Sequence, residues 1–549
     1  MNPKIILTAS EVEMCDFGQD PFIAFGAGFP TTFFFLHLVD EWLSHPGTVD
    51  GIRARLAPYG LRKVEAALLE YGFDEKEVAV VHPKELPKAV GDQTRVVGIS
   101  SMDPLGYAFV SLTYSALVGG SDESWTAKYF RKLMNNKYIK KIPVKILGGA
   151  GAWQVDTDIA RTRLGINTVI VGEGLKEVPS LFEKAVKGES IPKSVHTKQD
   201  PLVEVPTIRG ASINGTVRIT RGCGRGCHFC TPTMRKRDSV PLEQIIAEAK
   251  VQAAYGYDMI TLVTDDFFLY KLDNPKFIPN HAALVELFTE LTKIKEIRYI
   301  QPAHAALAPV IVGRKTFEEI ADITYGYGRY GYRGKNWMAV EVGLESGSPR
   351  LMSEHMNGKS IPLDIMKWQE IVEEATGIMN DNGWLPLGTI IVGMPGENED
   401  DVLKTLELID RLRKYVIFFV PLLFTPLHEC VLRNERRADL RKFSESQWEV
   451  FNRAWNHNIH TWREDWLGPL QNNIFINAFR KIGGAFAWWL YYRWGARKNI
   501  KKLLLSVTGW YDKKIDDYFK KVEVGKSLME RLAMKKSTSQ QELEKLIST

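Results

Sequence analysis

The chain has 549 residues, of which 45% are hydrophobic and 25% are charged. Its 71 basic and 66 acidic residues give a formal net charge of +5, which excludes the strongly basic character of a general nucleic-acid-binding protein. Three of the five cysteines fall between positions 223 and 230, which excludes a secreted disulfide scaffold. At about 100–200 residues per domain, the length predicts roughly three domains.

Residues 1–200 predict an α/β domain with a doubly wound sheet. Apolar strands are expected at 4–8, 78–82, 95–100, 144–147 and 168–171, and helices at 61–71 and 178–187. Small residues follow the last three strands, which is typical of parallel strands that bind a ligand beyond their carboxyl ends. Residues 190–215 contain prolines and polar residues, and we expect a linker there.

Residues 214–430 repeat a longer β/α unit six times. Strands are expected at 216–220, 259–264, 297–300, 338–342, 387–392 and 416–424, and helices at 242–255, 282–293, 363–375 and 400–413. Six such units predict a partial or complete parallel barrel, with its active site at the carboxyl ends of the strands. The strand pattern then stops, and residues 431–549 predict a helical C-terminal domain.

The N-terminus lacks the basic start and apolar run of a signal peptide. The most continuous apolar runs, 416–424 and 482–492, are too short to span a membrane. We therefore expect a cytoplasmic protein.

Cys223, Cys227 and Cys230 directly follow the first expected barrel strand, with the spacing CxxxCxxC. Thiolates are soft ligands that suit zinc or an iron–sulfur cluster. A structural zinc ion needs four ligands, and the nearest fourth candidate, His228, would have to fold back between two of the others. Three ligands on one loop instead favour a 4Fe–4S cluster with one iron left open to chelate a small molecule.

This motif, placed after the first strand of a six-unit β/α barrel, resembles the radical S-adenosylmethionine (SAM) superfamily. The resemblance covers about residues 214–430 and implies that the reduced cluster cleaves SAM to a 5′-deoxyadenosyl radical, which abstracts a substrate hydrogen. It also implies SAM contacts at the ends of later strands, from Asp265, Asp266, Glu345, Ser346, Gly393 and Gly396. Taken singly, each is equally typical of a helix cap or a turn. The resemblance leaves the catalytic residue unassigned.

The strand ends of the N-terminal domain resemble the cobalamin-binding domain that precedes the barrel in a large radical SAM subfamily. The resemblance implies cobalamin as a third cofactor, with contacts from Ser100, Ser101, Gly148, Gly149, Gly172, Glu173 and Gly174. The Asp-x-His-x-x-Gly motif, whose histidine ligates cobalt in several cobalamin enzymes, is absent. The alternative is a scaffold that keeps this fold without the cofactor.

Tryptophans and basic residues gather in the C-terminal region. Trp455, Trp462 and Trp466 precede an aromatic run at 475–494, and four basic residues follow by position 502. This combination favours peripheral contact with a membrane surface. A helix packed on the barrel, with solvated basic residues, is the alternative.

The whole layout resembles the archaeal tetraether-lipid (GDGT) ring synthases and the hopanoid methylases. This implies C–C bond formation, by ring closure or methylation, at an unactivated carbon of a hydrophobic membrane-lipid substrate. Two alternatives stay open: a cobalamin-dependent methyltransferase of a peptide or small natural product, and a non-catalytic iron–sulfur or zinc scaffold. A ferredoxin or flavodoxin is the expected electron donor, and no nucleic-acid partner is expected.

Overall fold

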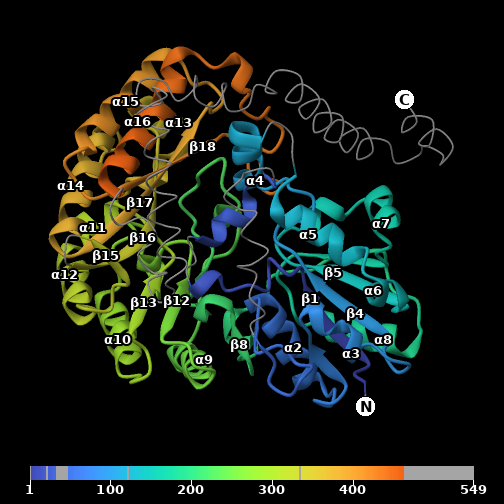
Figure 1. Cartoon of the computed structure of the whole chain (residues 1–549). Helices are drawn as coiled ribbons and strands as arrows, with labels where there is room; N and C mark the ends of the chain where they lie inside the picture. The colour runs from blue at the N-terminus through green and yellow to red at the C-terminus, as the bar shows by residue number, and fades with distance from the viewer. Residues whose placement is uncertain (1, 20–22, 32–46, 120–122, 333–334, 463–549) are drawn as a thin grey trace, which may run out of the picture.

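The computed structural model describes residues 2–19, 23–31, 47–119, 123–332 and 335–462. The expected mixed α/β fold is confirmed. Figure 1 shows two sheet-containing parts side by side, an N-terminal part in blue to cyan and a larger part in green to orange.

The N-terminal part is a six-stranded, all-parallel sheet in the order β3-β1-β4-β5-β6-β7. Its strands are β1 (Ile5–Ala9), β3 (Val78–Val80), β4 (Val96–Ser100), β5 (Val144–Gly148), β6 (Thr168–Val171) and β7 (Ser194–His196). Strand β7 lies inside the segment predicted as a linker. That segment was misjudged because β7 has only three residues and takes its hydrogen bonds from β6.

Both faces of this sheet are covered, because neighbouring side chains of a strand point to opposite sides. Ile5 and Leu7 enter one core, which also holds side chains of α2 (Tyr59–Tyr71) and α8 (Val178–Lys187). Ile6 enters a second core with side chains of α5 (Trp125–Met134) and α6 (Lys137–Lys141). The sheet is therefore a layer between two sets of helices.

The larger part holds parallel strands arranged in chain order. They are β9 (Thr216–Arg218), β12 (Met259–Val263), β13 (Tyr299–Pro302), β14 (His304–Ala305), β16 (Lys335–Glu345), β17 (Trp384–Val392) and β18 (Phe418–Leu423). The outer side carries helices α9 (Leu242–Ala254), α10 (His281–Thr292), α12 (Arg314–Ile323), α14 (Trp368–Asp381) and α15 (Glu399–Leu412), most of which Figure 1 shows along its curved edge.

Regular pairing is interrupted between the third and fourth units. Strands β9, β12 and β13 form one sheet, and β14, β16, β17 and β18 form another. Ala303 joins the two, because its N–H donates to Leu262 and its carbonyl accepts from Glu341. The side chain of Gln301 also donates to the carbonyl of Ala339, which fills part of the gap.

Strand β18 has one free edge, whose backbone groups are satisfied by side chains. The amide of Asn458, on α16 (Glu445–Trp462), accepts from the N–H of Phe419 at 2.8 Å and donates to its carbonyl at 2.7 Å. The N–H of Leu423 donates to the hydroxyl of Thr113, on α4 (Phe109–Tyr114) of the N-terminal part. These contacts cover an edge that would otherwise be open to pairing with another chain.

A second contact between the two parts is a buried polar cluster. Lys63 of α2 forms an ion pair with Glu248 of α9 at 2.5 Å, and the Tyr59 hydroxyl donates to the same carboxylate at 2.8 Å. The short parallel pair β2 (Leu56–Ala57) and β8 (Ala211–Ser212) lies in the same interface.

No described helix is both long and apolar enough to cross a membrane. Of the predicted C-terminal domain, the structure describes residues 431–462, where Trp455 packs against the barrel core. Trp466, the aromatic run and the basic residues after it lie outside the described residues.

Candidate active site

The cysteine loop (residues 222–231) begins at a short hairpin. Strands β10 (Thr220–Arg221) and β11 (Asp238–Ser239) pair antiparallel and close the base of the loop. Gly222, Gly224 and Gly226 have φ values of +79°, +78° and +80°, which side chains rarely adopt. These three glycines let the loop curl and turn its cysteines inward.

Cys223, Cys227 and Cys230 are reduced and line a common cavity. Burial raises the pKa of Cys223 and of Cys230, and it raises the pKa of Cys227 to about 11. The thiols are therefore neutral at physiological pH until a metal displaces their protons. Among the described side chains, no three donors are grouped closely enough to ligate one metal ion. The three thiols are a donor set that suits a 4Fe–4S cluster, in which each cysteine would ligate a different iron.

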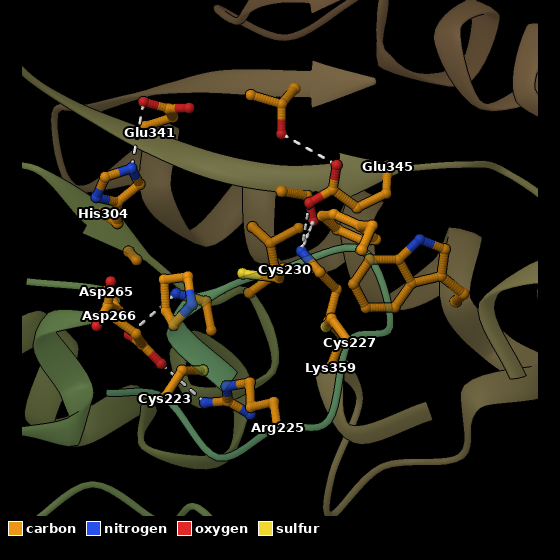
Figure 2. Close-up of a pocket in the computed structure, with 18 residues that line it drawn as sticks. Cys223, Arg225, Cys227, Cys230, Asp265, Asp266, His304, Glu341, Glu345 and Lys359 are labelled. Atoms are coloured by element: carbon orange, nitrogen blue, oxygen red, sulfur yellow. Dashed lines mark hydrogen bonds and ion pairs between the residues drawn. The ribbon is translucent and has the colours of Figure 1, made fainter. Parts of the chain in front are cut away.

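The cavity beside these thiols has a volume of about 190 Å³. Figure 2 shows the cysteines on one side, with Lys359 reaching toward Glu345 and with the pair His304–Glu341 at a separate corner. The lining comes from the carboxyl ends of several strands and from the cysteine loop: Cys223, Arg225, Cys227, Phe229, Cys230, Pro232, Asp265, Asp266, His304, Ala305, Ala306, Leu307, Glu341, Gly343, Glu345, Lys359, Trp368 and Thr389. The lining thus combines apolar side chains with seven ionisable groups besides the cysteines.

Asp266, predicted to contact SAM, lines the cavity but already has several partners. It forms a buried ion pair with Arg225 at 2.8 Å, and its other oxygen accepts from the N–H groups of Phe268 and Ala306. The Arg225 guanidinium also lies 4.2 Å from the ring centre of Phe277. Asp266 therefore ties the cysteine loop to the end of β12.

Asp265, also predicted, accepts one hydrogen bond, at 2.8 Å from the N–H of Gly222. Burial raises the pKa of this carboxyl, whereas His304 and the Gly222 N–H lower it. Since Asp265 faces the cavity beside the cysteines, it is the better placed of the two aspartates to meet a ligand.

Glu345 lies at an irregularity in β16 that turns its side chain into the cavity. Its φ of +57° is left-handed, and the pairing of β16 with β17 shifts between Gly343 and Glu345. Its carboxylate forms an ion pair with Lys359 at 2.7 Å. Burial alone would lower the pKa of Lys359, but Glu345 and the thiols of Cys227 and Cys230 raise it. Lys359 is thus a cation beside the cysteines, and the sequence analysis did not assign it to the site.

His304 and Glu341 form a cavity-facing pair that sequence reasoning missed. His304 Nε2 lies 3.4 Å from a Glu341 oxygen, and His304 Nδ1 lies 2.9 Å from the carbonyl of Thr264. Burial alone would lower the pKa of His304, but Glu341, the Thr264 carbonyl and Asp265 together raise it to about 9. The imidazole is therefore protonated at neutral pH. The sequence could have indicated Glu341, because it is the one charged residue in an otherwise apolar expected strand.

Three residues predicted to contact SAM do not line this cavity. Ser346 is buried and accepts a hydrogen bond from the N–H of Ser348. Gly393 has a φ of +82° and donates to Glu397, and the carbonyl of Gly396 accepts from Arg350. Hydrogen bonds of this kind are typical of turns. The role of the three residues in binding SAM stays a prediction.

The strand ends of the N-terminal sheet pack against one another. The carbonyl of Ser101 accepts from Gly151, and its hydroxyl donates to the buried Glu13 at 3.0 Å. A Cβ on Gly149 would lie 2.6 Å from the Ser101 carbonyl and 2.8 Å from the Ser100 hydroxyl. Gly148, in contrast, has open space where a side chain would be.

The Gly172–Glu173–Gly174 turn is also closely packed. A Cβ on Gly172 or on Gly174 would lie within 2.6 Å of the backbone at Thr197 or Lys198. Glu173 points to the barrel part, where it forms ion pairs with Arg218 and Arg235. The glycines thus explain the tight turn, and Glu173 has protein partners.

Curated relatives of this chain are tRNA-modifying enzymes. The chain is 25% identical over 283 residues to a tRNA-2-methylthio-N(6)-dimethylallyladenosine synthase of Caldicellulosiruptor saccharolyticus, which is 50% of this chain and 55% of that protein. It is 23% identical over 369 residues to the enzyme of the same name from Paracidovorax citrulli, which is 65% of this chain and 76% of that protein. The chain thus spans about half the length of the first of these relatives.

Among solved structures, the chain is similar to the cobalamin-dependent S-adenosylmethionine radical enzyme OxsB with aqua-cobalamin bound. The TM-score is 0.46 and the sequence identity 13%, over 82% of this chain and 55% of that chain.

Residues 217–409 match the model of the Radical SAM superfamily. The matched segment runs from β9 into α15 and includes the cysteine loop and the strand ends around the cavity. A 4Fe–4S cluster and SAM are the cofactors of this superfamily, which confirms both expectations. The chain therefore contains a radical SAM superfamily domain, whose matched segment includes Cys223, Cys227 and Cys230.

Proposed function

We propose that this chain is a cobalamin-dependent radical SAM enzyme that forms a C–C bond at an unactivated carbon of a hydrophobic substrate. One observation carries the proposal: three free thiols line one cavity together with charged strand-end side chains and a group of apolar side chains. When bound, the cluster and SAM supply a 5′-deoxyadenosyl radical for hydrogen abstraction, and cobalamin supplies a methyl group where the product is methylated.

The residues around the thiols act by position and charge. Lys359 places a cation beside Cys227 and Cys230, which favours thiolates and an anionic cluster. Arg225 and Asp266 fix the cysteine loop to β12. Asp265 offers a carboxyl oxygen to the positively charged part of SAM. In this proposal, Glu345 fixes Lys359 and meets SAM from the opposite side.

The apolar wall supports a hydrophobic substrate. Ala305 ends β14, Ala306 and Leu307 follow it, and all three line the cavity. Phe229 and Trp368 line it as well. Side chains of this kind bind hydrocarbon and exclude water, which protects a carbon radical from side reactions. A membrane lipid is the substrate class that we propose, with ring closure or methylation as the reaction. The C-terminal aromatic run that favours a membrane surface lies outside the described residues.

Cobalamin fits the N-terminal sheet by topology. Ligands of doubly wound sheets bind beyond the carboxyl ends of the strands, and those ends face the barrel here. Trp153, which follows β5, stacks on His428 of the barrel part with 5.6 Å between ring centres. Because Glu173, Ser101 and the packed glycines already have partners, we propose that the ligand contacts come mainly from Ser100 and Gly148.

A second candidate is methylthiolation of an adenosine in tRNA, which the names of the curated relatives favour. That reaction needs a sulfur donor. Outside the cysteine loop, the chain has only Cys15 and Cys430, which are both buried and far apart in the sequence. The near balance of charge also argues against a large nucleic-acid surface.

Anaerobic purification followed by iron and corrin analysis tests the cofactors. We expect about four irons per chain after reconstitution, bound corrin, and 5′-deoxyadenosine once the protein is reduced with SAM present. Cys227→Ser should lose iron and 5′-deoxyadenosine, whereas Cys430→Ser, which changes a buried thiol outside the loop, should keep both. A wild-type protein that makes no 5′-deoxyadenosine would refute the radical SAM activity.

Lipid extracts from cells with and without the gene test the substrate. We expect a lipid with an added ring or methyl group only in cells that carry the gene. Unchanged lipids together with a methylthiolated adenosine in tRNA would support the second candidate instead. Modification of a soluble peptide or small natural product by the pure protein would identify a soluble substrate.

A further inference from the structure

Glu173 extends from the N-terminal sheet into the barrel part. It follows β6, between two glycines that are packed against the backbone of residues 197–198. One carboxylate oxygen accepts from Arg235 at 2.6 Å. The other accepts from Arg218 at 3.0 Å and lies 3.9 Å from Nη1 of Arg221.

The three arginines flank the cysteine loop on both sides. Arg218 lies on β9 and Arg221 on β10, two residues before Cys223, while Arg235 follows the loop after η9 (Pro232–Met234). A single carboxylate on the N-terminal part therefore holds the beginning and the end of the loop that carries all three thiols.

Other carboxylates do not substitute for Glu173. Asp238 lies 3.9 Å from Arg221, and Glu429 lies 3.7 Å from Arg235. Arg221 is 4% exposed and donates to the carbonyl of Asp200, but its Nε and Nη1 have no hydrogen-bond partner among the described residues. Loss of the Glu173 charge would leave three neighbouring guanidinium groups with less negative charge near them.

We propose that Glu173 is a positioning residue that clamps both ends of the cysteine loop and sets the electrostatic potential beside it. The inference rests on the proposed function, because it takes the loop as the site of the 4Fe–4S cluster. It gives the N-terminal sheet a direct role in holding the cluster, separate from any cofactor contact.

Two effects follow when the carboxylate is removed. The three arginines repel one another, so the loop opens more often and the protein takes up less iron. The remaining clusters experience more positive charge, which favours the reduced state and shifts the midpoint potential to more positive values. A residue that only supported the fold would lower iron uptake without a shift in this direction.

The test compares Glu173→Gln with Glu183→Gln in the full-length protein. Glu183 is an exposed residue of α8, so its variant removes the same charge away from the loop. After anaerobic reconstitution, we expect less iron and a more positive midpoint potential for Glu173→Gln alone, measured by a redox titration followed by electron paramagnetic resonance. Glu173→Gln combined with Arg235→Gln restores part of the charge balance and should return the potential toward wild type.

Tryptic digestion of the iron-free proteins tests the clamp without the cluster. We expect roughly tenfold faster cleavage at Arg221 and Arg235 in Glu173→Gln, as when cleavage follows the open population of the loop. Glu173→Asp, which keeps the charge on a shorter side chain, should fall between the two. Equal cleavage and equal potentials for Glu173→Gln and Glu183→Gln would overturn the proposal. A wild-type protein without iron would refute the proposed function, and the digestion would still decide whether Glu173 holds the loop.

Discussion

At the scale of single residues, the cavity is lined by charges that are paired between different segments of the chain. Lys359 meets Glu345, Arg225 meets Asp266, and His304 meets Glu341. Each pair joins segments that are more than ten residues apart in the sequence. Each pair therefore forms only when the barrel part has folded, and each can be tested by neutralising one member.

The His304–Glu341 pair predicts a pH-dependent contribution to stability. The folded protein raises the pKa of His304 to about 9, above the reference value of 6.5. A raised pKa means that the pair contributes fully below about pH 6.5 and that the contribution is lost as the pH rises through about 9. We expect His304→Gln to lower the free energy of unfolding in urea at about pH 6 and to lower it much less at about pH 9.5. An equal loss at both values would show that His304 is not protonated in the folded protein.

At the scale of elements, the cysteine loop offers a matched pair of glycines. Gly222 and Gly224 both have left-handed φ values, but a Cβ on Gly222 would lie 2.7 Å from the carbonyl oxygens of Arg235 and Lys236. A Cβ on Gly224 would meet nothing within 4 Å. We expect Gly224→Ala to cost about 1–2 kcal/mol, the usual penalty of that conformation. Gly222→Ala should cost more and lose more iron, as measured by urea unfolding and iron content.

The free edge of β18 leads to a prediction for α16. Asn458 is fully buried, and its amide satisfies both backbone groups of Phe419. Asn458→Ala would leave a buried N–H and a buried carbonyl unpaired, at about 1–3 kcal/mol for each group. We expect a clear fall in the urea midpoint. Asn456→Ala on the same helix, which removes a bond to Asn452, should cost less. Similar losses for both variants would contradict this role for Asn458.

The strands and helices were predictable where the chain carries a periodic apolar pattern. The helix expected at 178–187 matches α8, which ends at Gly188 in a left-handed cap. Strand β7 was missed because three residues are too few to show a periodic apolar pattern. The cysteines were predictable from spacing alone. Lys359, His304 and the partners of Glu173 were not, because each depends on a charge that folding brings from a distant segment.

At the scale of the whole molecule, the two parts are joined by buried polar contacts. Lys63 and Glu248 have 8% and 1% of their side chains exposed, so neither charge is well solvated without the other. Breaking a buried pair by removing one partner costs about 3–5 kcal/mol. We expect Lys63→Met to destabilise the protein by about this amount. The double variant Lys63→Met/Glu248→Met should be more stable than the sum of the single losses predicts, and additive losses in urea unfolding would contradict the coupling.

The break between β13 and β14 has a mechanical consequence. Three parallel strands lie on one side of Ala303 and four on the other, and residues in or next to strands of both sheets line the cavity. A ligand that contacts both Cys223 and Glu345 would link the two sheets, which are otherwise joined through Ala303. Ligand binding should therefore slow amide hydrogen exchange in both sheets, including strands that the ligand does not contact.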